Sequence, residues 1–206
     1  LAGVNRGGKR LRVDYYCALT SPWTYLGHGR LRDIAARHGA EVTIHPVNVL
    51  AIFERTGGLP LPKRALERQA YRLQELRRWR ERLGVELNLK PAYFPADETR
   101  AAETVIAARA EGLDAMDLAG RFMRAVWAEE RDIGLARTIR EVVTEAGMDP
   151  GALERAAGRY DANAIRAAET DQAVARGVFG APTYVVGDEI FWGQDRLDFV
   201  DAALEA

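Results

Sequence analysis

Residues 181–192 read APTYVVGDEIFW, in which two runs rich in β-branched and aromatic residues flank the pair Gly187-Asp188. This pattern predicts an antiparallel hairpin, because glycine and aspartate suit the tight turns that join adjacent strands. An amphipathic pattern follows from Arg196 onward and predicts a helix. The C-terminal part of the chain is therefore expected to fold as β-β-α.

The N-terminal part predicts a second set of elements. Residues 11–19, LRVDYYCAL, predict a strand, because they are rich in β-branched and aromatic residues and Val13, Tyr15 and Cys17 fall on one face. A helix is expected to begin near Ser21 and to end near Gly39, because serine and glycine favour those two positions. Residues 41–47, EVTIHPV, predict a further strand. A β-α-β unit with so short a connection is expected to be parallel and right-handed.

The middle of the chain lacks β-branched runs and repeats Ala, Arg, Glu and Leu at helical intervals. The predicted fold class is therefore α/β, a thioredoxin-like sheet domain that an all-helical insertion interrupts. Residues 11–50 and 178–206 would form the sheet domain, and residues 51–177 the insertion. Residues 1–10 are interpreted as a flexible leader.

Composition excludes several classes of function. The 29 basic and 30 acidic residues nearly cancel, so no overall charge favours nucleic acid or an anionic membrane. No apolar run is long enough to span a bilayer, and a cytoplasmic location is expected. Cys17 is the only cysteine, which excludes an intramolecular disulfide and a CxxC redox pair. The three histidines lack metal-ligand spacing, and no metal site is expected.

Ser21 is the first candidate functional residue, in the motif SPWTYLG. One interpretation is structural, since serine before proline is a common helix start. A hydroxyl that accepts a backbone N–H still has its own proton to donate. Free thiols have a pKa near ~8.5, and a donor at the positive end of a helix favours the thiolate. Ser21 is therefore the candidate catalytic residue, acting on a thiolate without being a nucleophile.

The second candidate region surrounds Pro182. About 5–6% of X-Pro bonds are cis, and a cis bond here would turn the Ala181 N–H and C=O outward to pair with an extended peptide. Proline at a strand's first residue also has a purely structural interpretation. Gln194 and Asp195 precede the last helix. Asp195 is expected to be its N-cap, and its carboxylate is also able to bind an ammonium group.

SPWTYLG after the first strand, the helical middle and GVFGAPTYVVGDEIFWGQDRL together resemble a known group of enzymes. They are similar to the 2-hydroxychromene-2-carboxylate isomerases and kappa-class glutathione transferases, which have a DsbA-like thioredoxin fold. The likeness covers nearly all of residues 11–206. It implies glutathione as cofactor, a small aromatic substrate and, as is common in the group, a homodimer.

The resemblance also implies roles for individual residues. Ser21 stands where these enzymes place the residue that contacts the glutathione sulfur. Ala181 and a cis Pro182 match their backbone clamp for the cysteinyl portion, and Gln194 with Asp195 matches the dipeptide that holds the γ-glutamyl end. Related disulfide oxidoreductases carry CxxC near this serine, whereas this chain has SPWT. The thiol would therefore come from the bound cofactor.

The chain departs from these relatives after its second strand. Many of them carry Gly-Asn followed by basic and proline residues, and here Gly58 replaces the asparagine in GGLPLPK. Lys63 is a candidate for the missing glutathione contact. Asn48 is a candidate for a ligand contact or, as the favoured interpretation, for the cap of the next helix.

Five aromatic residues are candidates for the wall of an aromatic-substrate pocket, although aromatic side chains at such positions usually belong to the core. They are Trp23, Tyr25, Tyr93, Phe94 and Trp127. Residues 64–82 alternate arginine with glutamate and predict a solvated helix face, one of whose arginines is also able to attract a carboxylate. Cys17 is expected to be a buried apolar residue.

The predicted activity is isomerisation of an aromatic or hydroxychromene-type carboxylate. A C=C bond does not rotate while it remains double, but reversible addition of a thiolate makes it single until elimination restores it. The nearest alternative is a kappa-like transferase or peroxidase that uses the same glutathione site. Another is a non-catalytic glutathione-binding protein of the same fold.

Overall fold

The computed structural model describes residues 11–205, and the predicted leader lies outside them. The strands and helices follow one another as β1 (Arg12–Cys17), α1 (Pro22–His38), β2 (Glu41–Pro46), α2 (Val49–Thr56), the 3₁₀ turn η1 (Leu61–Lys63), α3 (Leu66–Leu83), α4 (Thr99–Ala110), α5 (Ala115–Trp127), α6 (Ala136–Glu145), α7 (Pro150–Arg159), α8 (Ala162–Ala175), β3 (Thr183–Val186), β4 (Glu189–Trp192), the 3₁₀ turn η2 (Gln194–Arg196) and α9 (Leu197–Glu205).

The strands form one mixed sheet in the order β2-β1-β3-β4. β1 pairs with β2 in parallel, with Tyr15 opposite Ile44. β1 pairs with β3 in antiparallel fashion, and β3 and β4 form the expected hairpin, in which Val186 faces Glu189. The predicted thioredoxin-like fold class is confirmed.

Local signals in the sequence account for the ends of α1. The Ser21 side chain accepts a hydrogen bond from the Thr24 N–H, and Pro22 occupies the first helical position. Gly39 ends the helix in the left-handed conformation with φ 61°, which a glycine adopts without steric cost. The predicted start and end of this helix are therefore confirmed.

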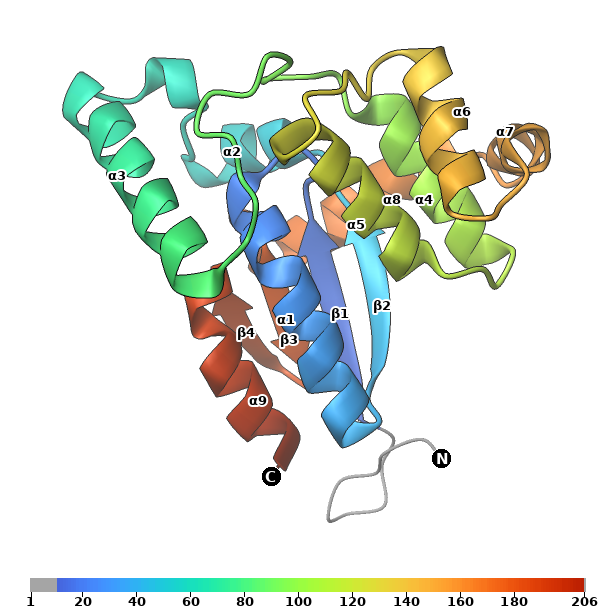
Figure 1. Ribbon diagram of the computed structural model, residues 1–206. Coiled ribbons are helices and arrows are strands. Elements are labelled where there is room, and N and C mark those ends of the chain that lie inside the picture. Colours follow the sequence, from blue (N-terminus) through green and yellow to red (C-terminus); the bar gives the residue numbers. More distant parts are fainter. Residues whose placement is uncertain (1–10, 206) are drawn as a thin grey trace.

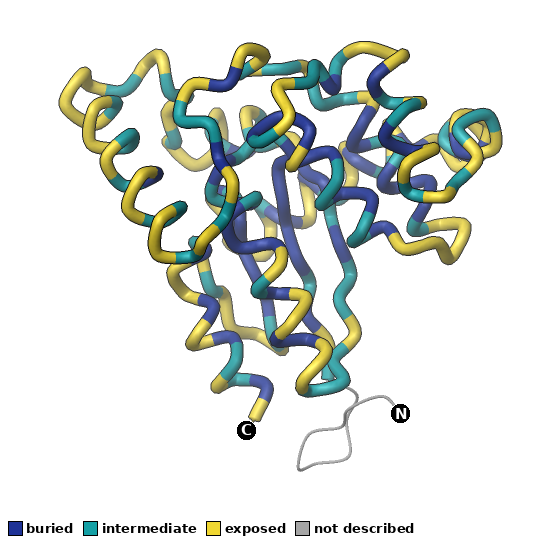
Figure 2. The backbone as a smooth tube through the Cα atoms, in the orientation of Figure 1, coloured by how far each residue is buried: buried dark blue, intermediate teal, exposed yellow. Residues whose placement is uncertain are grey.

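The two faces of the sheet pack against different helices (Figure 1). Alternate residues of β1 divide between the faces, so that Tyr15 belongs to the larger core with residues of α1, α4, α5 and α9, whereas Tyr16 contacts a smaller cluster. That smaller cluster contains Ile52 of α2 and Ala173 of α8. The central strands and the helix faces against them are accordingly the buried parts of the chain (Figure 2).

One apolar core runs through both parts of the predicted domain division. Tyr15 and Tyr184 from the sheet share it with Trp127, Val142 and Leu153 from the helices. The division between sheet domain and helical insertion stays a prediction, and the two parts are packed together. No helix among residues 11–205 is long and apolar enough to cross a membrane.

Candidate functional site

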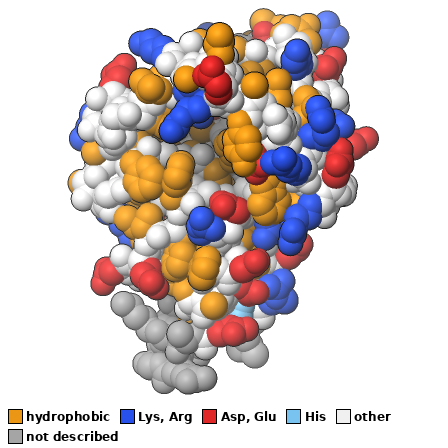
Figure 3. Space-filling model, turned by 90° about the vertical axis from the view of Figure 1, so that its left-hand side faces the viewer, with side chains coloured by type: hydrophobic (Ala, Val, Ile, Leu, Met, Phe, Trp, Pro, Cys, Tyr) orange, Lys and Arg blue, Asp and Glu red, His pale blue; other side chains and the backbone are white. Residues whose placement is uncertain are grey.

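A cleft of about 320 Å³ lies where α1 begins, beside the start of β3, the end of β4 and one face of α3. Its lining combines aromatic, charged and backbone groups from these segments: Trp23, Glu75, Trp79, Ala181, Pro182, Trp192, Gly193, Gln194, Asp195 and Arg196. Figure 3 faces the side of the molecule that carries α3, where apolar side chains gather among basic and acidic ones. Residues predicted from both ends of the chain therefore meet in one place.

Ser21 is half-buried at the start of α1, two residues before Trp23 of the cleft wall. Its Oγ accepts a hydrogen bond from the Thr24 N–H at 3.3 Å. The hydroxyl proton is not used in this bond, so Ser21 keeps a donor while it caps the helix. The predicted capping role is confirmed. Ser21 itself is not among the residues that line the cleft, and its hydroxyl lies at the positive end of the 17-residue helix whose Trp23 does.

The peptide bond between Ala181 and Pro182 is cis, as expected. Pro182 is buried and Ala181 is half-buried in the cleft wall. The Pro182 carbonyl accepts a hydrogen bond from the Gly193 N–H at 2.9 Å, which joins the start of β3 to the turn after β4. Phe94-Pro95 is also cis, a feature that the sequence analysis did not predict.

Gln194 is buried against α1. A methyl group on Gly27 would lie 2.8 Å from Gln194 Cβ, so the absence of a side chain at Gly27 permits this close approach. Arg30 Nη1 donates to the Gln194 carbonyl at 3.1 Å and to its Oε1 at 3.0 Å. Gln194 is thus positioned by α1, and its predicted contact with a ligand stays a prediction.

Asp195 lies inside the turn η2, where Gly193 occupies the N-cap position with φ 105°. The expectation that Asp195 caps the last helix is wrong, because the chain makes a 3₁₀ turn before α9 begins at Leu197. Its exposed carboxylate lies 3.4 Å from Arg196 Nη1. Glu75, which pairs with Arg78, also lines the cleft, so two carboxylates and the Arg196 guanidinium border this space.

Lys63 and Asn48 lie outside the lining of this cleft. Lys63 is exposed at the end of η1. Asn48 caps α2, since its Oδ1 accepts hydrogen bonds from the Leu50 and Ala51 N–H groups, each at 3.2 Å. The favoured structural interpretation of Asn48 is confirmed, and the ligand contacts proposed for both residues stay predictions.

The candidate aromatic residues separate into three places. Trp23 lines the cleft, whereas Tyr25 belongs to a different hollow and donates its hydroxyl proton to the Glu86 carbonyl at 2.8 Å. Phe94 and Trp127 contact each other with ring centroids 4.9 Å apart, and Tyr93 is exposed nearby in sequence. Trp127 is fully buried, as the alternative of a core residue predicted.

The loop that leads into Ser21 is anchored by a buried carboxylate. Glu98 Oε2 accepts from the Thr20 backbone N–H at 2.8 Å and from its hydroxyl at 2.9 Å. Glu98 Oε1 accepts from Arg166 Nη2 at 2.9 Å, and the guanidinium also donates to the Pro46 and Val47 carbonyls. This network fixes the end of β1, and sequence analysis missed it because it joins segments far apart in the chain.

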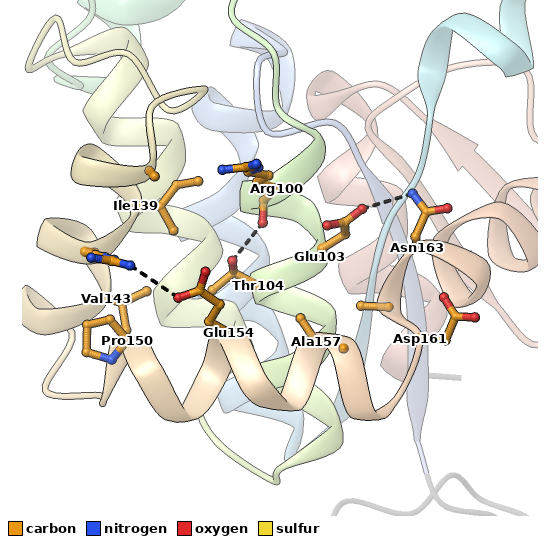
Figure 4. Close-up of a pocket in the computed structure, with 14 residues that line it drawn as sticks. Arg100, Glu103, Thr104, Ile139, Val143, Pro150, Glu154, Ala157, Asp161 and Asn163 are labelled. Carbon is orange, nitrogen blue, oxygen red and sulfur yellow. Dashed lines mark hydrogen bonds and ion pairs between the residues drawn. The ribbon is translucent and has the colours of Figure 1, made fainter.

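A second pocket, of about 370 Å³, lies between α4, α6, α7 and α8, and none of its lining residues belongs to the cleft (Figure 4). Thr104, Ile139 and Pro150 are among these residues. Among residues 11–205, no group of His, Cys, Asp and Glu side chains is arranged to hold a metal ion.

Comparison with known proteins identifies the fold and the group to which this arrangement belongs. The family model described as "DSBA-like thioredoxin domain" matches residues 12–205. A 2-hydroxychromene-2-carboxylate isomerase from Sphingobium xenophagum is 31% identical in an alignment of 198 residues that covers 93% of this chain and 97% of that protein. The chain belongs to this DSBA-like family.

Two solved structures superpose on the DSBA-like chain over most of its length. The 2-hydroxychromene-2-carboxylate isomerase structure has a TM-score of 0.80 at 28% identity and covers 94% of each chain. The cytosolic disulfide reductase DsbM of Pseudomonas aeruginosa, solved with GSH, has a TM-score of 0.69 at 18% identity over 94% of this chain and 96% of its own. The second likeness shows a shared fold. The family predicted from the sequence motifs is confirmed.

This DSBA-like domain has a serine at the start of α1 and its single cysteine elsewhere. Cys17 is buried on β1, and burial raises the pKa of its thiol well above the usual value. A buried, protonated thiol is a poor nucleophile, so the predicted structural role fits its surroundings. A thiolate at the cleft would have to come with a ligand.

Sequence analysis missed five residues of the cleft: Glu75, Trp79, Trp192, Gly193 and Arg196. The sequence contained a signal for Glu75 and Trp79, because their spacing of four residues places them on one face of a helix. The alternation of arginine and glutamate along α3 led instead to the interpretation of a solvated face.

Proposed function

We propose that the protein is a glutathione-dependent isomerase of an aromatic or hydroxychromene-type carboxylate. The observation that carries the proposal is that Trp23 in the first turn of α1, the cis Ala181-Pro182 segment and Asp195 line one cleft, with Ser21 at the N-cap of the same helix. The named isomerase relatives support the type of reaction, since they match nearly the whole chain. The glutathione dependence rests on the chemistry of the cleft residues.

The cleft residues fit glutathione, a tripeptide with one ammonium, two carboxylates and a thiol. Asp195 and Glu75 offer carboxylates for the ammonium, and Arg196 offers a guanidinium for a carboxylate. The Ala181 backbone belongs to the same cleft lining as Trp23 and the η2 turn, and an extended peptide is able to pair with it. The volume of about 320 Å³ is at the lower end for a small-molecule site, which suits a partly exposed tripeptide.

Ser21 is proposed to stabilise the thiolate form of the bound cofactor. Its Oγ–H remains available as a donor, and the dipole of α1 adds positive potential at the same point. Both effects favour an anionic sulfur over a neutral thiol and lower its pKa. Glu98 holds the preceding residue Thr20 and so keeps this hydroxyl in place.

When bound, glutathione supplies a thiolate that adds reversibly to a conjugated double bond and leaves unchanged. The protein has to orient the tripeptide through Asp195, Arg196 and the Ala181 backbone. It also has to keep the Ser21 donor directed at the sulfur and the aromatic substrate in contact with it. A cytoplasmic setting, a homodimer and a small-molecule partner in place of nucleic acid are part of the same proposal.

Calorimetric titration with glutathione tests the cofactor, and ultraviolet spectra of a hydroxychromene carboxylate with and without glutathione test the reaction. We expect binding, and isomerisation only when glutathione is present. Wild-type protein that binds no glutathione at millimolar concentration would remove the proposal. Total glutathione should stay constant during turnover, and its consumption would favour the transferase or peroxidase alternative.

A further inference from the structure

Arg72 of α3 lies over two aromatic rings that come from other parts of the chain. Its guanidinium carbon is 5.3 Å from the centre of the Phe94 ring and 5.8 Å from that of Trp127. Phe94 belongs to the connection between α3 and α4, which passes between α3 and α5 in Figure 1, and Trp127 ends α5. The arginine therefore sits in a half-buried aromatic corner.

This arginine has no carboxylate partner among residues 11–205, although most arginines nearby in the fold are paired or exposed. Burial and the neighbouring Arg64 lower the pKa of Arg72 to about 10, so it still carries a full charge at neutral pH. The Arg64 side chain has a backbone partner, since its Nε donates to the Leu59 carbonyl at 2.7 Å. Arg72 therefore brings to this corner a positive charge that no carboxylate among the described residues pairs with, since Glu75, one turn along α3, pairs with Arg78.

The N–H groups of Arg72 are available for an oxygen ligand. Stacking on a ring uses the face of a guanidinium, whereas its five N–H donors point outward in its plane. A second donor in the same cluster also lacks a partner, because the Trp127 Nε1 is buried and has no hydrogen-bond acceptor among the described residues. Buried donors without acceptors are rare, and they commonly mark a place for a ligand or water.

Arg72, Phe94 and Trp127 do not line the cleft, but α3 contributes residues to both places. Arg72, Glu75 and Trp79 are spaced to lie on one face of this helix, and the last two line the cleft. α3 itself packs against α1, at whose start Ser21 lies. A ligand that reaches from the cleft along this face of α3 meets Arg72 one helical turn beyond Glu75.

We propose that Arg72 binds the carboxylate of the aromatic substrate and that the Phe94 ring contacts the substrate's own ring. The inference rests on the proposed function, to which it adds the recognition of the acid group. A planar guanidinium pairs with a carboxylate through two parallel N–H···O bonds. The aromatic ring beside it favours a flat apolar substrate. An aromatic acid therefore satisfies both features of the corner, whereas an aliphatic acid or a neutral aromatic compound satisfies one.

Salicylate and its neutral analogue salicylamide test this site in the full chain at saturating glutathione. Wild-type protein should bind salicylate more tightly than salicylamide. Arg72→Met, which keeps the length of the side chain, should lower salicylate affinity about 10- to 100-fold and leave salicylamide affinity nearly unchanged. Arg72→Lys should recover part of the loss. Arg77→Met is the matched control, because Arg77 is exposed on the same helix.

The same titrations separate failure of this inference from failure of the proposed function. Glutathione binding should be equal in wild-type protein, Arg72→Met and Arg77→Met. If wild-type protein binds no glutathione, the isomerase proposal falls, while the salicylate-to-salicylamide ratio still tests Arg72. An equal ratio in wild-type protein and Arg72→Met would overturn the carboxylate site. In turnover assays, Arg72→Met should raise KM for the acid and change kcat by only a few fold.

Discussion

The cleft beside Ser21 and the pocket between α4, α6, α7 and α8 have nearly the same size, about 320 and 370 Å³. They differ in what surrounds the space. The cleft brings together the start of α1, the start of β3 and the turn after β4 with one face of α3. The helical pocket is formed mainly by the sides and ends of helices (Figure 4).

Charged groups in the two places are paired in a similar way. In the helical pocket Arg140 pairs with Glu154 at 3.4 Å, and Glu103 accepts from Asn163 at 3.0 Å. In the cleft Asp195 pairs with Arg196 at 3.4 Å and Glu75 pairs with Arg78, and the cis-proline backbone borders the same space. Volume alone does not distinguish a binding site from a packing gap. The backbone of the cis-proline segment borders the cleft and has no counterpart in the helical pocket.

The largest expected difference between the two places concerns stability. Glu98→Ala removes the buried partner of Arg166 and of the Thr20 loop before Ser21, and it should lower the free energy of unfolding by about 3–5 kcal/mol. Glu154→Ala removes an exposed partner in the helical pocket and should cost about 0–1 kcal/mol. Urea unfolding of the two variants measures both values.

Equal losses in these two variants would mean that the cleft loop is no more strongly anchored than the helical pocket. Glu98→Gln refines the measurement, because the amide keeps an acceptor for the Thr20 N–H and loses the charge that Arg166 faces. It should be intermediate between wild type and Glu98→Ala in stability.

Removal of one hydroxyl group from each place tests the assignment of function. Ser21→Ala should lower kcat/KM for glutathione-dependent isomerisation by about 10²–10³-fold, the range found when a single donor to a developing anion is lost. Loss of the helix cap should cost about 1 kcal/mol of stability as well. Thr104→Ala, whose hydroxyl bonds the Arg100 carbonyl within α4, should leave kcat/KM within a few fold of wild type. A similar loss in both variants would contradict the assignment.

Acid should destabilise the protein through His28, which lies in α1. This buried imidazole donates from Nε2 to the Met116 carbonyl at 2.8 Å, and burial lowers its pKa to about 4. Because the unfolded chain takes up the proton near pH 6.5, stability should fall between pH 6.5 and 4 by up to about 3 kcal/mol. His28→Gln should lose this part of the pH dependence in urea unfolding. An unchanged slope in the variant would rule out His28 as its source.

The pKa of His45 is shifted in the opposite direction, so the two histidines affect stability in different pH ranges. Burial opposes its charge, but hydrogen bonds to the Asp14 and Glu169 carboxylates raise its pKa. Its contribution to stability is therefore complete below pH 6.5 and declines as pH rises through the raised value. The contribution of His45 to stability does not change between pH 6.5 and 4, the interval in which protonation of His28 lowers stability.

Most of the fold was predictable, because the decisive signals are local. Alternation of residues along β1, the Ser21-Pro22 start, Gly39 and the Gly187-Asp188 turn each specify an element without reference to the rest of the chain. The turn η2 was not predictable in this way. Asp195 resembles a helix cap in sequence, and the tertiary contact of Gln194 with Gly27 and Arg30 accompanies a 3₁₀ turn in its place.

The candidate site was predictable only where a residue belongs to a motif. Ser21, Pro182 and Asp195 lie in such motifs, and they lie at or beside the cleft. Glu75 and Arg72 do not, because they are embedded in an arginine-rich helix whose composition indicates a solvated face. Whether such a residue faces solvent, a cleft or an aromatic ring depends on how α3 packs, and this packing involves segments far apart in sequence.

The smallest effect is expected at Asp195 and compares one carboxylate from each place. Asp195→Asn should weaken glutathione binding about 10-fold, because the amide no longer offers a charge to the ammonium group. Asp161→Asn in the helical pocket is the matched control, since asparagine keeps the cap on the Ala164 N–H and tolerates the left-handed backbone at this position. Calorimetry should give the wild-type affinity for this control. If Asp161→Asn weakened binding as much as Asp195→Asn, glutathione would not be recognised at the cleft, and the distinction between the two cavities would fail.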